Sequence, residues 1–184
     1  KMIVNKIGVF SDVYEITPDI FYDHRGFFYE SFVSKKVQDI IGYKINFVQD
    51  NHSLSSKNVI RGLHFQISPF AQSKLLRCIN GSVLEVIVNI DKNSSSFLKY
   101  EKIIVSASKR NSIFIPNHYA HGFLALEDDT ELIYKTDNYY SSNEQVTLKW
   151  NDELLNIDWN INLNDVILSD RDKKASSFKE YFKL

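Results

Sequence analysis

Short runs of alternating hydrophobic and polar residues dominate the chain and predict a protein built from β-strands. Most of these runs end at Gly, Pro, Asn or Asp, the residue types that favour turns. We expect strands at residues 8–17, 46–49, 59–66, 74–79, 82–90, 102–106, 112–115, 121–126, 131–136 and 146–150. Many short strands with regular turn signals predict an all-β fold, either an antiparallel sandwich or a small barrel.

Two connections have the sequence of a β-hairpin. Asn80 and Gly81 separate two apolar runs and favour the positive φ angles of a type I′ turn. We therefore expect strands 74–79 and 82–90 to pair with each other. An acidic turn at residues 127–129 predicts a second hairpin between the strands on either side of it.

Helical spacing of apolar residues occurs in only two places. Residues 34–41 carry three branched apolar side chains on one face, and Gly42 follows as a stop signal. Residues 169–182 are polar apart from a short aromatic stripe near their end. We expect short helices near the N- and C-terminal ends of one domain that spans residues 1–184.

Composition narrows the class of protein. A formal net charge of -1 gives no overall basic field for nucleic acid or an anionic membrane, so we expect neither partner. No apolar run approaches the roughly 20 residues that span a bilayer. The single cysteine, Cys78, excludes an intrachain disulfide and fits a reducing compartment, so we expect a cytoplasmic protein.

The run Val59–Gln66 holds the most suggestive chemistry. It places His64 among apolar residues, with Arg61 three positions earlier and Gly62 between them. Apolar walls, one titratable base and one cation suit proton abstraction from an anionic substrate. The same run is also compatible with a hydrogen-bonded core histidine beside a surface arginine. In a regular strand the two side chains would face opposite sides. A shared pocket therefore predicts a bulge or irregular backbone at Gly62.

Other polar residues are open to both structural and functional interpretations. Arg25, Arg61 and Lys74 would suit a diphosphate if they converged, and are solvated surface cations otherwise. Glu85 lies inside an apolar strand, where a carboxylate needs a ligand, a cation or an edge position. His118 and His121 have a spacing compatible with zinc, but no third ligand stands out, and we expect no metal.

Taken together, several motifs resemble one family in order and spacing. They are Phe21-x-Asp23-x-Arg25-Gly26-Phe27-Phe28-x-Glu30, Gln49-Asp50-Asn51-x-Ser53, Arg61–Gln66, Pro69-x-Ala71-Gln72-x-Lys74, Ile115-Pro116-x-x-x-Ala120-His121-Gly122-Phe123, and Tyr134-Lys135 through Tyr139-Tyr140 to Trp150. The chain resembles the dTDP-4-dehydrorhamnose 3,5-epimerase family of bacterial nucleotide-sugar enzymes from about residue 7 to residue 172. No single motif is diagnostic, but the ordered set is specific.

The resemblance implies a jelly roll or cupin-like β-barrel, a homodimer, and an active site inside the barrel that uses no cofactor and no metal. It implies His64 as the base and Asp172 as its carboxylate partner. Tyr134 would be the acid on the opposite face of the sugar, and Lys74 would lie near the 4-keto oxygen. The residues implied to bind nucleotide, phosphates or sugar are Arg25, Phe28, Glu30, Gln49, Asn51, Arg61, Glu85, His121 and Tyr140.

The implied reaction is epimerisation at C3, C5 or both of a nucleoside-diphosphate-linked 4-keto-6-deoxy sugar, for bacterial surface polysaccharide. The ketone acidifies the neighbouring hydrogens, so an imidazole base, a lysine beside the developing enolate and a protonated tyrosine are sufficient. The alternatives are C3-only epimerisation or 3,4-ketoisomerisation on a related sugar nucleotide. A non-catalytic sugar-nucleotide-binding cupin is a further alternative. A metal-dependent cupin oxygenase is disfavoured because Gln66 stands where the second metal-binding histidine is needed.

Four positions depart from the family pattern. Glu85 stands in place of an aspartate, Arg171 in place of a lysine and Asn160 in place of a proline, and Glu144 lies one position from the expected acid. The nucleotide base (thymidine or guanosine), the sugar (hexose or heptose), the number of centres inverted and the polysaccharide pathway stay open at this point.

Overall fold

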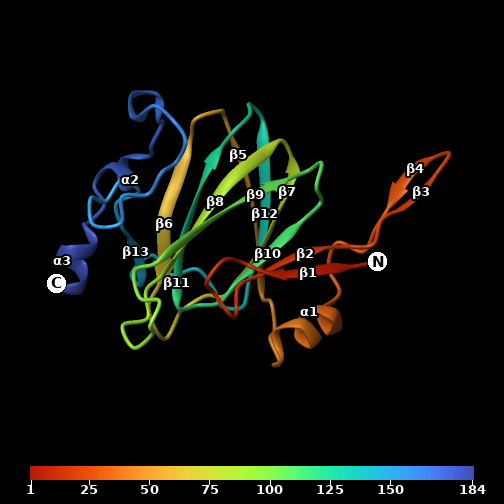
Figure 1. Ribbon diagram of the computed structural model, residues 1–184, viewed down its shortest axis with the longest axis horizontal. Helices are drawn as coiled ribbons and strands as arrows, with labels where there is room; N and C mark the ends of the chain where they lie inside the picture. Colours follow the sequence, from red (N-terminus) through yellow and green to blue (C-terminus); the bar gives the residue numbers. More distant parts are fainter.

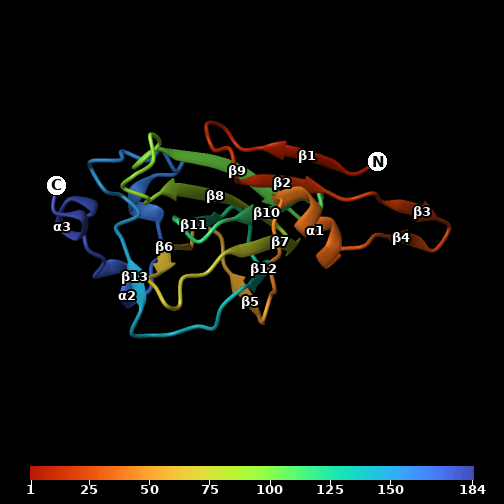
Figure 2. The same cartoon turned by 90° about the horizontal axis from the view of Figure 1, so that it is seen from below.

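Two antiparallel β-sheets packed face to face form the body of the protein in the computed structural model, which describes residues 1–184 (Figures 1 and 2). The first sheet contains, in spatial order, β1 (Ile3–Lys6), β2 (Tyr14–Thr17), β10 (Ser112–Ile115), β7 (Lys74–Asn80), β12 (Thr130–Thr136) and β5 (Gln49–Ser55). The second contains β13 (Gln145–Thr147), β6 (Ile60–Gln66), β11 (Tyr119–Ala125), β8 (Ser82–Asn89) and β9 (Tyr100–Ser106). The predicted all-β antiparallel fold is confirmed.

Both predicted hairpins are wrong, because the strands on either side of each turn lie in different sheets. β7 pairs with β10 and β12, whereas β8 pairs with β9 and β11. Likewise, β11 and β12 belong to opposite sheets. Gly81 does adopt a positive φ of 70°, but a Cβ there would lie 2.5 Å from the Thr130 Oγ1 atom. The turn therefore carries the chain around a packed corner between the sheets.

Two separate cores lie on the two faces of the second sheet. The core between the sheets includes Leu76, Ile87 and Phe123. The core on the outer face includes Trp159 and Phe178, which belong to the C-terminal segment that covers β6 and β13 in Figure 1. Because side chains alternate along a strand, residues of β6, β8 and β11 that do not face this outer core face the space between the sheets.

The helices are short, as predicted, but the C-terminal one is divided. α1 spans Ser34–Ile41, and Gly42 ends it in the left-handed region with φ of 85°. The expected helix at residues 169–182 is instead α2 (Asp170–Lys173) and α3 (Phe178–Phe182). Ser169 and Ser177 each accept a hydrogen bond from a backbone N–H at the start of the helix that follows. Two capping serines thus start two helices, and a 3-10 turn, η1 (Leu163–Asp165), precedes them.

A hairpin of β3 (Phe21–Asp23) and β4 (Gly26–Phe28) projects beyond the sandwich in Figure 1 and was not predicted. All of its residues are exposed, so it lacks the alternation of buried and exposed positions that reveals a strand. The guanidinium of Arg110, in the connection between β9 and β10, lies 4.1 Å from the centre of the Phe27 ring and makes a cation–π contact with the hairpin. No helix of the structure has both the length and the apolar character needed to cross a membrane.

Candidate active site

A bulge at Gly62 brings Arg61 and His64 to the same face of β6, as predicted from the sequence. His64 lies opposite His121 of β11, and Arg61 lies opposite Phe123. β6 therefore advances three residues where β11 advances two, so β6 contains one extra residue. Gly62 has φ of 142°, and a Cβ on it would lie 2.5 Å from the Gly122 Cα atom. Only glycine fits this close approach of two strands. Arg61 and His64 consequently line one open cavity of about 490 Å³.

His64 and Asp172 form a hydrogen-bonded pair in that cavity. The His64 Nε2 and Asp172 Oδ1 atoms are 2.6 Å apart, although the residues are 108 positions apart in the chain. The Asp172 backbone N–H donates to the Ser169 Oγ, which caps the first turn of α2. The Asp172 side chain is 3% exposed and that of His64 is 27% exposed. The carboxylate is thus enclosed while the imidazole reaches the cavity.

Lys74, Glu85 and His121 form a buried polar cluster between the sheets. The Glu85 Oε1 and His121 Nδ1 atoms are 2.5 Å apart, and Glu85 is 0% exposed. Burial lowers the pKa of Lys74 to about 8, opposed by the charges of Glu85 and Asp137. Burial also raises the pKa of Glu85 well above its usual value, and the charge of Lys74 opposes this shift. The cluster places one cation and one carboxyl group in a dry interior.

Four further predicted site residues, Gln49, Asn51, Tyr134 and Tyr140, lie on or beside the paired strands β5 and β12. The Gln49 side chain donates to the Asn51 Oδ1 at 3.0 Å and accepts from the Tyr140 backbone N–H at 3.0 Å. Asn51 lies opposite Tyr134 on the neighbouring strand. Burial raises the pKa of Tyr134, and the positive charge of Arg61 opposes that rise. Tyr134 therefore keeps its phenolic proton close to the cavity that Arg61 and His64 line.

Arg171 is a candidate site residue that was noted in the sequence only as a departure from the family pattern. Its Nη1 donates to the Gln145 Oε1 at 2.8 Å and to the Tyr140 hydroxyl at 3.3 Å. It lines the same cavity as Arg61, so two arginines belong to the cavity that contains the His64–Asp172 pair. No local pattern distinguishes this arginine from a solvated one, because its partners are 26 and 31 positions away.

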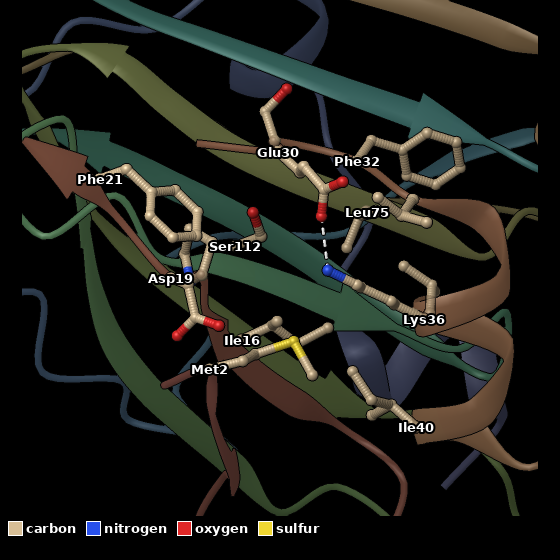
Figure 3. Close-up of a pocket in the computed structure, with 14 residues that line it drawn as sticks. Met2, Ile16, Asp19, Phe21, Glu30, Phe32, Lys36, Ile40, Leu75 and Ser112 are labelled. Atoms are coloured by element: carbon tan, nitrogen blue, oxygen red, sulfur yellow. Dashed lines mark hydrogen bonds and ion pairs between the residues drawn. The ribbon is translucent and has the colours of Figure 1, made fainter. Parts of the chain in front are cut away.

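Three predicted binding residues are not brought to this cavity within one chain. Arg25 and Phe28 are exposed on the β3–β4 hairpin, where Arg25 pairs with Asp23 at 2.6 Å. Glu30 pairs with Lys36 of α1 at 2.5 Å. Figure 3 shows this ion pair at a separate, mostly apolar groove between α1 and the strands that carry Ile16 and Ser112.

His118 and Cys78 have partners outside the cavity that contains His64. His118 pairs with Asp12 at 2.8 Å, so it does not share a ligand with His121, whose partner is Glu85. No group of three or more His, Cys, Asp or Glu side chains is gathered in a geometry that would hold a metal ion. The buried Cys78 thiol donates to the backbone carbonyls of Asn80 and Gly81.

Comparisons with known proteins agree with this fold and identify the family. The sequence profile of a family described as dTDP-4-dehydrorhamnose 3,5-epimerase matches residues 9–180. The enzyme of that name from Escherichia coli K12 is 47% identical over 173 residues, which cover 94% of this chain and 93% of that protein. A crystal structure of the same-named enzyme from Elizabethkingia anophelis is 40% identical, with a TM-score of 0.92 over 97% of both chains.

A second solved structure holds a sugar nucleotide. It is a dTDP-6-deoxy-D-glucose-3,5-epimerase from Legionella pneumophila in complex with dTDP-4-keto-L-rhamnose. It is 36% identical, with a TM-score of 0.91, and the match covers 96% of this chain and 93% of that one. Both the sequence profile and the identity extend over almost the whole length, so the chain belongs to the dTDP-4-dehydrorhamnose 3,5-epimerase family of isomerases.

Proposed function

We propose that this protein inverts C3 and C5 of dTDP-4-keto-6-deoxy-D-glucose to give dTDP-4-keto-L-rhamnose, a precursor for surface polysaccharide. The single observation that carries the proposal is the His64–Asp172 pair, 2.6 Å apart, in a cavity whose lining includes Arg61 and Arg171. Residues 1–184 act as one epimerase domain in the cytoplasm, where the buried thiol of Cys78 stays reduced.

His64 acts as the base in this mechanism. The Nε2 atom of His64 contacts Asp172. With Nε2–H donating to that carboxylate, Nδ1 keeps a lone pair for the substrate. That nitrogen removes the proton from a carbon next to the ketone, and the electrons pass to the ketone oxygen to give an enolate. C3 and C5 flank the same ketone, so one electron sink serves both centres. Asp172 steadies the imidazolium that forms.

Tyr134 and Lys74 complete the reaction. The protonated phenol of Tyr134 returns a proton to the carbon from the face opposite His64, which inverts the centre. The ammonium group of Lys74 stabilises the enolate oxygen in a dry environment, where one charge has a large effect on the barrier. Arg61 and Arg171 hold the diphosphate, and Gln49, Asn51 and Tyr140 position the rest of the substrate.

Activity is expected to fall as the pH rises through the pKa of Lys74, which is about 8. The ammonium form stabilises the enolate, and its fraction decreases about tenfold for each pH unit above the pKa. The basic limb of a pH profile of kcat/KM measures this pKa in the free enzyme. A Lys74→Arg variant keeps its charge at all these pH values, so its residual activity should lack the limb. A wild-type limb that begins only at the ordinary lysine pKa would contradict this assignment of Lys74.

We also propose a homodimer in which the β3–β4 hairpin enters the site of the other subunit. The hairpin exposes Phe28 by 66%, Phe21 by 62% and Tyr22 by 68%, and it projects from the body in Figure 1. Exposed aromatic patches of this kind mark surfaces that bind another protein. Arg25 and Phe28 have no route to the cavity of their own chain in this arrangement, so a second copy is the partner that gives them a binding role.

Mixing two impaired variants tests this exchange. An Arg25→Ala enzyme has a complete base but a defective hairpin, and a His64→Asn enzyme has the reverse. A hybrid dimer then holds one intact site, and random mixing of subunits should restore about a quarter of wild-type activity. Native mass spectrometry confirms that hybrids form. Hybrids with no activity beyond that of the two parents would rule out an exchanged hairpin.

Product analysis tests the proposed function itself. The enzyme is incubated with dTDP-4-keto-6-deoxy-D-glucose and, separately, with its GDP counterpart, and the products are identified by NMR. Inversion at both centres of the dTDP sugar is the expected result. Inversion at C3 alone, migration of the keto group, or turnover of the GDP sugar only would each replace the proposal with the corresponding alternative.

A further inference from the structure

A second histidine–carboxyl pair lies directly beside the first. His121 of β11 is the cross-strand neighbour of His64, and both side chains project from the same face of the second sheet. Glu85 of β8 lies opposite Phe123, two residues along β11, so its side chain shares that face. The pairs use opposite ring nitrogens, because Asp172 contacts Nε2 of His64 whereas Glu85 contacts Nδ1 of His121.

The surroundings of Glu85 decide where the proton of this pair resides. The Glu85 Oε2 atom is enclosed and has no hydrogen-bond partner in the chain. An ionised carboxylate would place part of its charge on that bare oxygen, whereas a carboxylic acid would leave a neutral carbonyl there, which is far less costly to bury. Burial raises the pKa of Glu85 and lowers that of His121, and both shifts favour the uncharged pair. The charge of Lys74 opposes the rise in the pKa of Glu85 but adds to the fall in the pKa of His121.

We propose that Glu85 is a positioning residue that keeps a proton on Oε1 and donates it in a hydrogen bond to His121 Nδ1, which fixes His121 as the Nε2–H tautomer. The Nε2 atom makes no hydrogen bond within the chain and is not fully enclosed, so it is free to donate to a substrate oxygen beside His64. The two neighbouring histidines then have different tasks. His64 presents a lone pair and removes a proton, while His121 presents an N–H and holds an oxygen.

The different roles of His64 and His121 follow from which ring nitrogen each carboxyl group contacts and from which partner donates the proton. If Glu85 were ionised, it would accept from Nδ1–H, and His121 would present a lone pair instead of a donor. Two lone-pair imidazoles side by side would offer no donor to an enolate or hydroxyl oxygen. This assignment to the reaction rests on the proposed epimerase function, but the tautomer of the free protein does not depend on it.

The ring nitrogens of ¹⁵N-histidine-labelled protein report the tautomer directly by NMR at about pH 7.5, without substrate. We expect a protonated Nε2 and an unprotonated Nδ1 for His121 in the wild-type protein, with signals assigned from a His121→Gln variant. A protonated Nδ1 with a bare Nε2 would overturn the proposal. This measurement uses the wild-type fold, so it holds even if a Glu85 variant fails to fold.

Two variants of similar size test the consequence for catalysis. Glu85→Gln retains a neutral donor to Nδ1, whereas Glu85→Met retains the length of the side chain without any donor. We expect kcat to be about tenfold higher for the glutamine variant than for the methionine variant, with smaller differences in KM. Equal kcat values for the two variants would show that catalysis does not need a hydrogen-bond donor to His121 Nδ1.

The outcomes separate failure of this inference from failure of the proposed function. An Nε2–H tautomer together with no turnover of any 4-keto sugar nucleotide would leave the positioning role of Glu85 standing and remove the epimerase assignment. The reverse tautomer in an enzyme that inverts both centres would keep the function and remove the role of Glu85.

Discussion

Replacement of His64 by asparagine is expected to lower kcat by at least about a thousandfold. Asparagine keeps a polar group near Asp172, which lies 2.6 Å from the native ring, but it cannot accept a proton from carbon. Exchange of the substrate hydrogens with solvent should be lost together with turnover, because both begin with the same abstraction. Steady-state kinetics and deuterium incorporation in D₂O measure the two effects on one preparation.

His52→Asn is the matched control for that substitution. His52 is exposed on β5 and pairs with Glu131, so the change should leave kcat within about twofold of the wild-type value. A His64→Asn enzyme that still exchanges hydrogen at the wild-type rate would remove His64 from the role of base.

Replacement of Tyr134 by phenylalanine is expected to separate exchange from inversion. His64 would still remove the proton and return deuterium from its own face, so exchange should stay within about tenfold of wild type. Inversion should fall by at least about a hundredfold, because the phenolic proton on the other face is missing. Burial raises the pKa of Tyr134 and keeps that proton in place in the native enzyme. Product NMR in D₂O distinguishes labelled substrate from labelled epimer.

Tyr43→Phe serves as the control for loss of a phenol, since Tyr43 is exposed and does not line the cavity that contains His64. It should leave both rates unchanged within about twofold. Equal losses of exchange and inversion in Tyr134→Phe would mean that Tyr134 contributes to the first abstraction and is not the acid of the second face.

Most strand positions were predictable from the sequence, but strand pairing was not. The strand predicted at residues 8–17 is confined to β2, the one predicted at 46–49 lies instead at β5, and β1 was missed. The turn at Asn80 and Gly81 has the residues of a hairpin and a positive φ at Gly81, yet it joins strands of opposite sheets. Turn chemistry specifies local backbone angles, whereas pairing in a jelly roll depends on distant strands. The bulge at Gly62 was predictable because Arg61 and His64 would face opposite sides of a regular strand and could share a pocket only if the strand were interrupted between them.

Only some of the candidate site residues could be predicted from the properties of individual residues in the sequence. Glu85 could be identified as a carboxyl group in need of a partner, but its contact with His121, 36 positions away, required the fold. Asp172 and Tyr134 carry no local signal, and resemblance to a family supplied their roles. Neither residue-level reasoning nor the family resemblance assigned a role to Arg171. Its partners Gln145 and Tyr140 come near it only when the C-terminal segment packs over β6 and β13.

The central claim is that His64 removes a proton on one face and Tyr134 returns one on the other. Its most direct test is turnover of dTDP-4-keto-6-deoxy-D-glucose by the wild-type enzyme in D₂O, followed by NMR of the product. The mechanism predicts dTDP-4-keto-L-rhamnose that carries one deuterium at each of C3 and C5, since each inverted centre receives its hydrogen from solvent. An inverted product that retains its original hydrogen at either carbon would contradict it.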